Sequence, residues 1–164
     1  LYLIGAVTRR QGEVVVLRVK PPTFPKGASE YGETQVRYWS LNETNRNTST
    51  PLGLRDDQFK VASDGFVYVA IGDKGIRRQA RQRGYNFMPW RIRGQTGAVI
   101  YRNMVTDPSY AGSIDKVPIL DLSDSRNIYA QNATRFIGDY APSGAVISLR
   151  RFLKGGGRIT PPRR

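Results

Sequence analysis

Short runs of β-branched and aromatic residues, separated by turn-forming residues, restrict this chain to a small set of folds. The strongest run, residues 66–71, is apolar throughout and follows an Asp-Gly pair. A short, continuously apolar run after a turn signal predicts a central strand with both faces buried. Seven or so short strands favour an all-β, two-sheet sandwich of jelly-roll type over any alternation of strands with helices. The other runs that predict strands are residues 2–7, 13–20, 35–41, 84–92, 97–105 and 144–152.

The turns between these runs predict how the strands connect. Residues 9–12 have the composition of a hairpin turn, with Gly12 at the position that needs a positive φ, so the first two predicted strands are expected to pair. Residues 42–54 are rich in Thr, Ser and Asn, whose side chains compete for backbone hydrogen bonds, and they predict an exposed loop. Pro89 lacks an N–H group and marks the strand predicted at 84–92 as an edge strand.

The last third of the chain predicts one helix and a tail. Residues 125–137 carry apolar side chains near helical spacing, and Gly138 can end the helix. Residues 115–122 predict a short strand or an extended connection. Further on, three consecutive glycines and a Pro-Pro pair offer little apolar surface to bury. We therefore expect one β-sandwich domain over residues 1–153 and a flexible basic tail over residues 154–164.

The chain contains no cysteine and no histidine, and this absence excludes many kinds of active site. Disulfides, thiolate nucleophiles, imidazole bases, zinc fingers and covalent haem attachment all lack the residues that they need. The acidic clusters, Asp56-Asp57 with Asp64 and Asp121 with Asp124, suit turns and helix caps better than a Ca²⁺ site. We therefore expect a non-catalytic protein with no disulfide partner, no metal site and no cofactor.

The positive charge is concentrated in two segments. The chain has 26 Lys and Arg against 13 Asp and Glu, a formal net charge of +13. Residues 74–93 hold seven basic side chains and residues 150–164 hold six, and neither segment contains an acid. Because these 13 basic residues equal the whole net charge, the remainder of the chain is neutral. Such segregation favours an anionic partner over a general adaptation to solubility.

Arginine is the main basic side chain of these segments, and its guanidinium group pairs bidentately with carboxylates and phosphates. We expect the internal segment to form an exposed, arginine-rich loop. A high-GC coding bias explains the same arginine content, so this alternative stays open. The candidate partner-binding residues are Arg77, Arg78, Arg81, Arg83, Arg91, Arg93, Arg150, Arg151, Arg158, Arg163 and Arg164.

The first function that agrees with these features is that of a non-catalytic structural or accessory subunit. It would dock through its arginine-rich loop and basic tail on an acidic face of a larger assembly, for example a membrane-embedded electron-transport or light-harvesting complex. This hypothesis accounts for the neutral remainder of the chain, the two basic segments and the absence of catalytic residue types with the fewest assumptions.

Two alternatives stay open. The runner-up is an RNA-binding or ribosomal protein, but the basic residues avoid the strand faces on which sheet-based RNA readers carry aromatic rings. Tyr85 and Phe87 follow the arginines, and their strand spacing favours core packing over stacking on bases. The other alternative is a carbohydrate-binding jelly roll that uses Trp39 or Trp90 as a platform, although both lie in predicted strands.

The order of motifs between residues 12 and 108 resembles that of a known family. The segments EVVVLRVKPPTFP, QVRYWSLNETN, FVYVAIGDKG, YNFMPWRI and GAVIYRNMVTDP follow one another. This order is similar to that of an all-β domain of unknown function found in bacterial envelope and secreted proteins. The resemblance implies a jelly-roll-like sandwich and a periplasmic or envelope location, and it implies no activity. The absence of an initiator methionine before Leu1 agrees with an upstream signal peptide or anchor.

Overall fold

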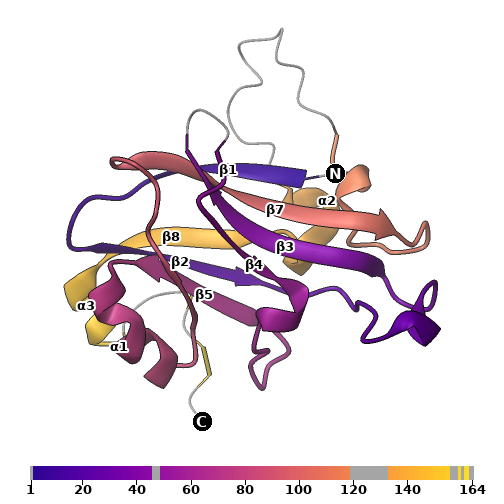
Figure 1. Ribbon diagram of the computed structural model, residues 1–164, viewed down its shortest axis with the longest axis horizontal. Helices are drawn as coiled ribbons and strands as arrows, with labels where there is room; N and C mark the ends of the chain where they lie inside the picture. Colours follow the sequence, from indigo (N-terminus) through magenta and orange to yellow (C-terminus); the bar gives the residue numbers. More distant parts are fainter. Residues whose placement is uncertain (1, 46–48, 119–132, 156–158, 160, 163–164) are drawn as a thin grey trace, which may run out of the picture.

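The computed structural model describes residues 2–45, 49–118, 133–155, 159 and 161–162, and these form two packed four-stranded sheets (Figure 1). The strands are β1 (Tyr2–Thr8), β2 (Glu13–Val19), β3 (Val36–Thr44), β4 (Leu52–Arg55), β5 (Val67–Gly72), β6 (Asn86–Pro89), β7 (Thr96–Thr106) and β8 (Ser143–Ser148). The first sheet has the order β1-β7-β3-β4 and is antiparallel throughout. The second has the order β6-β5-β2-β8, in which only β5 and β6 are parallel. The prediction of an all-β, two-sheet sandwich is confirmed.

Short helices lie in the connections and after the last strand. The α-helices are α1 (Arg77–Gln82), α2 (Thr134–Ile137) and α3 (Leu149–Leu153). The 3₁₀ turns are η1 (Ala28–Glu30), η2 (Asp56–Gln58), η3 (Lys74–Ile76), η4 (Ile114–Lys116) and η6 (Gly138–Tyr140). Of the helix predicted at 125–137, residues 125–132 lie outside the described residues. Within the described part, α2 ends at Gly138, which has a φ of 56°, as expected. Within 115–122, the described part continues η4 and holds no strand, and residues 119–122 lie outside the described residues.

The prediction that the first two strands pair as a hairpin is wrong. Gly12 does have a positive φ of 79°, but β1 pairs with β7, and β2 lies between β5 and β8 in the other sheet. Val15 and Val19 of β2 pack in one core and Val14 and Val16 pack in the other, so both faces of the strand are buried. Its two edges pair with β5 and β8. Residues 9–12 therefore form a corner between the sheets. Arg9 holds this corner because its backbone N–H donates to Gln95 O at 2.8 Å and its Nε donates to Glu13 O at 2.7 Å.

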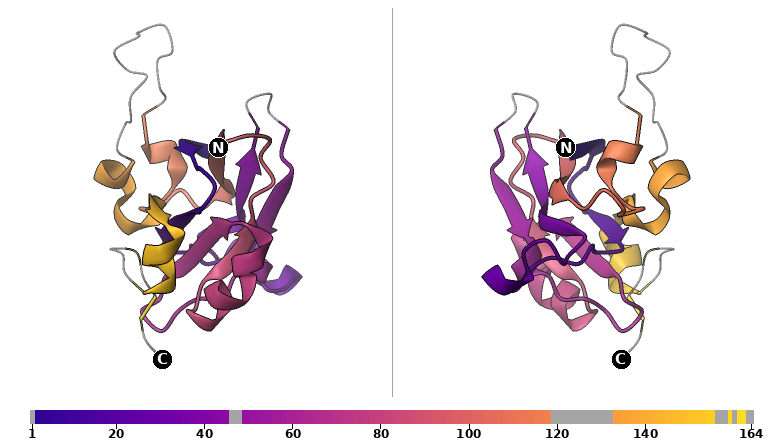
Figure 2. Two further views of the ribbon diagram at one scale, coloured as in Figure 1. Left: turned by 90° about the vertical axis from the view of Figure 1, so that its left-hand side faces the viewer. Right: turned by 90° about the vertical axis from the view of Figure 1, so that its right-hand side faces the viewer.

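Strand β5 is buried on both faces, as its apolar sequence predicted. One face packs between the two sheets in a core that includes Val69, Ile71 and Trp39. The other face carries Tyr68 and Ala70, and α1 and α3 cover it. The molecule thus has three layers, with the helices α1 and α3 on the outer side of the second sheet (Figure 2).

The prediction of an exposed loop over residues 42–54 is wrong at both ends of this range, where the structure has strands. Strand β3 continues to Thr44 and β4 begins at Leu52, while residues 46–48 lie outside the described residues. The polar side chains are tolerated because cross-strand pairing satisfies the backbone, and Asn42 Nδ2 donates to Ser40 Oγ at 2.9 Å. The strands predicted at 84–92 and 97–105 are confirmed as the edge strand β6 and as β7.

Two predictions near the basic segments are also corrected. The strand predicted at 144–152 ends at Ser148, whose hydroxyl accepts from the Arg151 N–H at 3.2 Å and so caps α3. The arginine-rich loop is the helical segment η3–α1, because Ile76 and Ala80 are one helical turn apart and bury their side chains against the sheet.

Ile159 and Pro161, in the second half of the segment 154–164, contact the domain. Tyr85 Oη donates to Ile159 O at 2.6 Å, and the Ile159 side chain packs against the core between the second sheet and the helices. Pro161 is buried and lies beside Gly84. The expectation that this segment offers little surface to bury therefore does not hold for Ile159 and Pro161.

Candidate anion-binding surface

Helix α1 presents arginines to solvent because it has one apolar side. Ala80 is completely buried, whereas Arg77, Arg78 and Arg81 are exposed. The helix has only six residues, so its stability comes from packing on the sheet rather than from helix propensity. Gly84 ends this region with a φ of 82° and turns the chain into β6.

Helix α3 is built in the same way from the other basic segment. Phe152 is buried among the residues that cover the second sheet, and Arg150, Arg151 and Lys154 are exposed. The Ser148 cap starts the helix directly after β8, so the end of that strand sets the direction of α3. Both helices thus use an apolar side chain as an anchor and leave their described cations exposed to water.

The structure brings these two helices together. The rings of Tyr85, which follows α1, and Phe152, in α3, have centroids 5.3 Å apart. The Arg83 guanidinium donates to the carbonyl oxygen of Leu153 across the same junction. We call the resulting surface the basic end. It consists of Arg77, Arg78, Arg81, Arg83, Arg150, Arg151 and Lys154.

The basic end has no internal counter-charge. Within the described part of the chain, no ion pair involves any of its seven cations. Asp73, the acid just before η3, is paired with Arg9 at 2.6 Å. Cations that are exposed, close together and unpaired repel one another, so an anionic partner would relieve this repulsion on binding.

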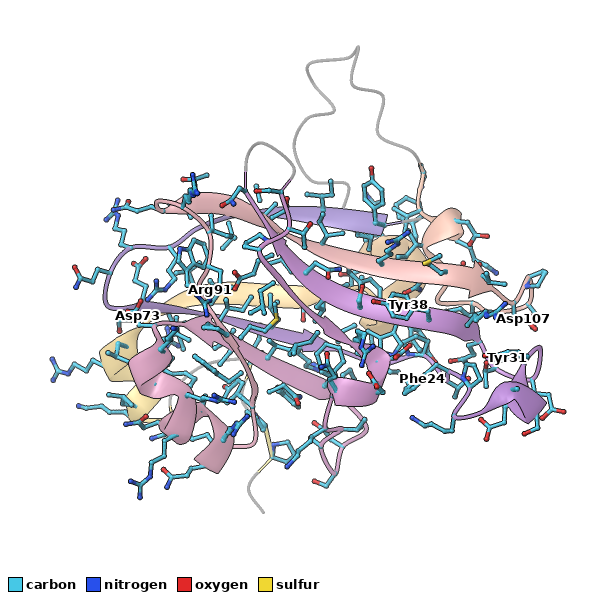
Figure 3. The ribbon with its side chains drawn as sticks, viewed as in Figure 1. Phe24, Tyr31, Tyr38, Asp73, Arg91 and Asp107 are labelled. Carbon is cyan, nitrogen blue, oxygen red and sulfur yellow. The ribbon has the colours of Figure 1, made fainter. Side chains whose placement is uncertain are left out.

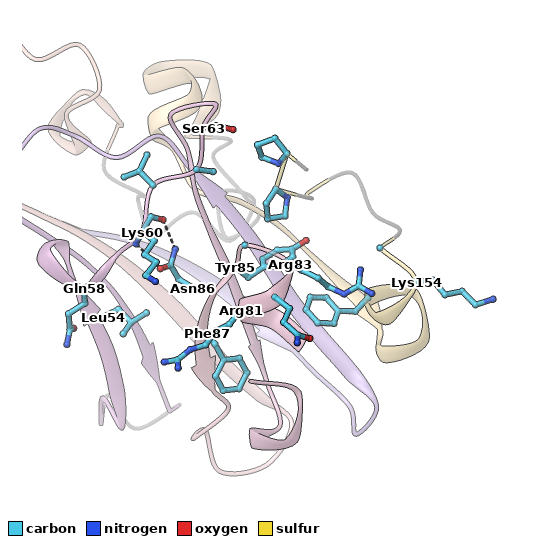
Figure 4. A pocket seen from close by; sticks show the side chains of 18 residues that line it. Leu54, Gln58, Lys60, Ser63, Arg81, Arg83, Tyr85, Asn86, Phe87 and Lys154 are labelled. Atoms are coloured by element: carbon cyan, nitrogen blue, oxygen red, sulfur yellow. Dashed lines mark hydrogen bonds between the residues drawn. The ribbon is translucent and has the colours of Figure 1, made fainter. Parts of the chain in front are cut away.

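A groove of about 810 Å³ opens beside the basic end (Figure 4). Among its described lining residues, the cations are Arg81, Arg83, Lys60 and Lys154, and none is acidic. Its rings are Tyr85, Phe87 and Phe152, of which only Phe87 is appreciably exposed. The remaining lining residues are Leu54, Gln58, Val61, Ala62, Ser63, Gln82, Gly84, Asn86, Gly155, Pro161 and Pro162.

Lys60 belongs to this site although its sequence neighbourhood did not point to it. Asn86 fixes its backbone, because the Lys60 N–H donates to Asn86 Oδ1 and Asn86 Nδ2 donates to Lys60 O, both at 2.9 Å. These residues are 26 positions apart. No feature of the neighbouring sequence identifies Lys60 as a site residue, because the charges around it are of both signs. Only its tertiary contact with Asn86 places it at the groove.

The other predicted arginines lie elsewhere or outside the described residues. Arg91 and Arg93 are exposed on the segment that crosses from β6 to β7. Figure 3 labels Arg91. Their backbone N–H groups donate to Glu43 Oε2 at 2.9 Å and to Asn45 Oδ1 at 2.8 Å. They are not part of the junction between α1 and α3. Residues Arg158, Arg163 and Arg164 lie outside the described residues.

Glu43 is a buried carboxyl that the sequence placed in an exposed loop. It follows Trp39 and Leu41 on the inward face of β3, and this alternation is the signal that could have identified it. Its side chain is 0% exposed, and its Oε1 has no hydrogen-bond partner. Burial raises its pKa to about 7, against the lowering effects of the Arg91 N–H and of the Arg91 and Arg9 charges.

The raised pKa of Glu43 predicts a stability that depends on pH. Because the folded protein binds this proton more tightly than the unfolded chain, the stabilisation is complete below pH 4.5 and is lost as the pH rises through about 7. The loss is about 3 kcal/mol. Urea unfolding from pH 4.5 to 8 measures it, and Glu43→Gln, which keeps an acceptor for Arg91, should flatten the decline. Parallel curves for the two proteins would contradict the assignment.

The tryptophans do not form an exposed platform. Trp39 is 1% exposed and stacks on Phe59 with ring centroids 4.4 Å apart. Trp90 is half-buried, its Nε1 donates to Gly94 O at 3.0 Å, and the Arg9 guanidinium lies 5.5 Å from its ring centroid. The sugar-binding alternative therefore lacks the freely exposed ring on which it was based.

Two further features are absent from the described residues. They contain no group of three or more Asp or Glu side chains placed to hold a metal ion. None of the helices in the described part of the chain has both the length and the apolar character that a bilayer crossing requires.

The fold and the site together define a β-sandwich domain with a cationic surface at the basic end. Comparison with known proteins assigns this domain to no family. No protein family and no curated protein matches the sequence. An uncharacterized protein from Burkholderia cenocepacia is a weak structural neighbour, with 13% identity and a TM-score of 0.49 over 91% of this chain. The VPA0106 protein from Vibrio parahaemolyticus has 13% identity and a TM-score of 0.43 over 90%. This chain spans only 30% and 31% of those two chains, and neither likeness carries an argument about function.

Proposed function

We propose that this domain is a non-catalytic accessory subunit that docks through its basic end on an acidic face of a larger protein assembly. The observation that carries this proposal is the junction of α1 and α3. Two cationic segments, about 70 residues apart in sequence, meet through the Arg83–Leu153 hydrogen bond and the Tyr85–Phe152 ring contact. Such an arrangement concentrates positive potential on one surface, which favours and orients association with an anionic partner.

Arginine suits a protein partner in this role. Its planar guanidinium makes two parallel hydrogen bonds to a carboxylate and is less strongly hydrated than an ammonium group. The exposed groups of the basic end are mostly arginines, and they stand on helices rather than on a strand face with exposed rings. An RNA-binding surface of the sheet type would carry aromatic side chains among the cations. We include an envelope location in this proposal, as the family resemblance implies, and we propose a membrane complex as one example of the larger assembly.

Removing three outward arginines tests the proposal. Arg77, Arg78 and Arg151 changed together to Gln should leave folding intact, because exposed charges contribute about 0–1 kcal/mol each and Gln keeps the helix propensity. Wild-type protein from nuclease-treated, detergent-solubilised membranes should elute with a stoichiometric acidic protein, and the variant should elute without it. Native size exclusion with mass spectrometry measures both.

A charge-matched variant separates a specific surface from overall charge. Arg102, Lys116 and Arg135 are exposed and lie outside the basic end, so their joint change to Gln removes the same three charges elsewhere. This control should keep the partner. A wild-type protein that elutes alone would refute docking. A complex destroyed by nuclease, with an affinity that falls log-linearly with salt at a slope of about −0.7 per phosphate, would instead identify a nucleic-acid partner.

A further inference from the structure

We infer that the groove beside the basic end binds an extended acidic peptide segment. This inference rests on the proposed function and assigns the groove, rather than the helices alone, as the place where such a segment lies. The groove has about 810 Å³, within the range of about 300–1,000 Å³ that ligand sites occupy. The described lining residues include four cations and no acid, so a carboxylate chain would meet complementary charge there.

The cations reach the groove from three separate parts of the fold. Lys60 stands on the segment after β4, Arg81 and Arg83 come from α1 and the residue after it, and Lys154 follows α3. Three of them are exposed, and Arg83 is partly held by its bond to Leu153 O. Positive charge that comes from separate parts of the fold suits a ligand with several spaced anionic groups better than a single small anion.

An edge strand borders the groove. Asn86 and Phe87 of β6 line it, and β6 is the terminal strand of the second sheet. An extended peptide can lie along such an edge and use main-chain hydrogen bonds for affinity. Pro89 lacks an N–H group and limits the pairing to the start of β6, which protects the edge from sheet-to-sheet aggregation.

The rings of the groove favour a peptide over a single-stranded nucleic acid. Tyr85 is 6% exposed and Phe152 is 2% exposed, and the Tyr85 hydroxyl is occupied by Ile159 O. Only Phe87 offers part of a ring face. Single-strand binding proteins stack successive bases on a row of exposed rings, and this groove has no such row among its described residues.

The test uses a fluorescein-labelled decaglutamate peptide and a labelled ten-nucleotide oligouridylate on the full chain. Decaglutamate should bind the wild type and shift the NMR signals of Phe87 and Asn86. Lys60→Gln with Arg81→Gln should weaken it about ten-fold, since two ion pairs are lost. The backbone of Lys60 stays fixed by Asn86, so this variant should melt like the wild type.

Arg102→Gln with Lys116→Gln is the matched control, because it removes two exposed charges outside the groove. It should change the affinity less than about two-fold. Equal weakening by both variants, tighter binding of oligouridylate at equal salt, or no binding of either probe would each overturn the inference. A native complex that survives Lys60→Gln with Arg81→Gln but not the loss of Arg77, Arg78 and Arg151 would refute the groove assignment and leave the docking proposal intact.

Discussion

Val69→Asp is expected to unfold the protein. Val69 is 0% exposed, lies in β5, and pairs with Leu17 on one side and Asn86 on the other. Its side chain packs between the sheets in a hydrophobic core, so the new carboxylate would be buried among apolar side chains. Burial of an unpaired charge costs several kcal/mol, and a domain of this size has about 5–15 kcal/mol of stability. Loss of the far-UV circular dichroism transition and of dispersed methyl signals would show the unfolding.

Val105→Asp is the matched control. Val105 is 71% exposed and has a φ of 50°, a conformation that a β-branched residue adopts at a cost and that aspartate tolerates better. This change should leave the melting temperature unchanged or raise it slightly. If Val69→Asp instead melted cooperatively within a few degrees of the wild type, the burial of β5 between two layers would be wrong.

Trp39→Ala is expected to cost about 3–5 kcal/mol, because it removes the largest fully buried side chain and leaves a cavity. The indole stacks on Phe59 and meets Tyr101 edge-on at 6.1 Å, so it joins the two sheets and the η2 turn. The hydrogen bond from the Trp39 N–H to Asp56 Oδ2 is made by the backbone and survives the substitution. Urea unfolding followed by circular dichroism measures the loss.

Two variants check that the effect of Trp39→Ala comes from the cavity. Trp39→Phe keeps a ring against Phe59 and should lose less than half as much stability. Trp90→Ala removes a half-buried indole and should also lose less. Comparable losses at both tryptophans would place them in equivalent environments and contradict the burial of Trp39.

The two segments that form the basic end could be predicted from the sequence, but their meeting in space could not. Its two segments are visible in the sequence because charge is a local property, and neither contains an acid. The loop predicted for the first segment was wrong because Ile76 and Ala80 form an apolar side only when β2 and β5 lie beneath them. Lys60 had no local signal, since two hydrogen bonds to a residue 26 positions away bring it to the groove.

By itself, the sequence determined the β class, the doubly buried strand β5, the turn glycines Gly12 and Gly138, and the segregation of charge. Each of these features depends on the backbone propensity, the pattern of apolar and polar side chains, or the charge of a few neighbouring residues. Only the tertiary structure decided that β1 pairs with β7, that Glu43 is buried, and that α1 meets α3. These features depend on contacts between distant segments, such as Arg83 with Leu153 at a separation of 70 residues, and local preferences do not specify such partners.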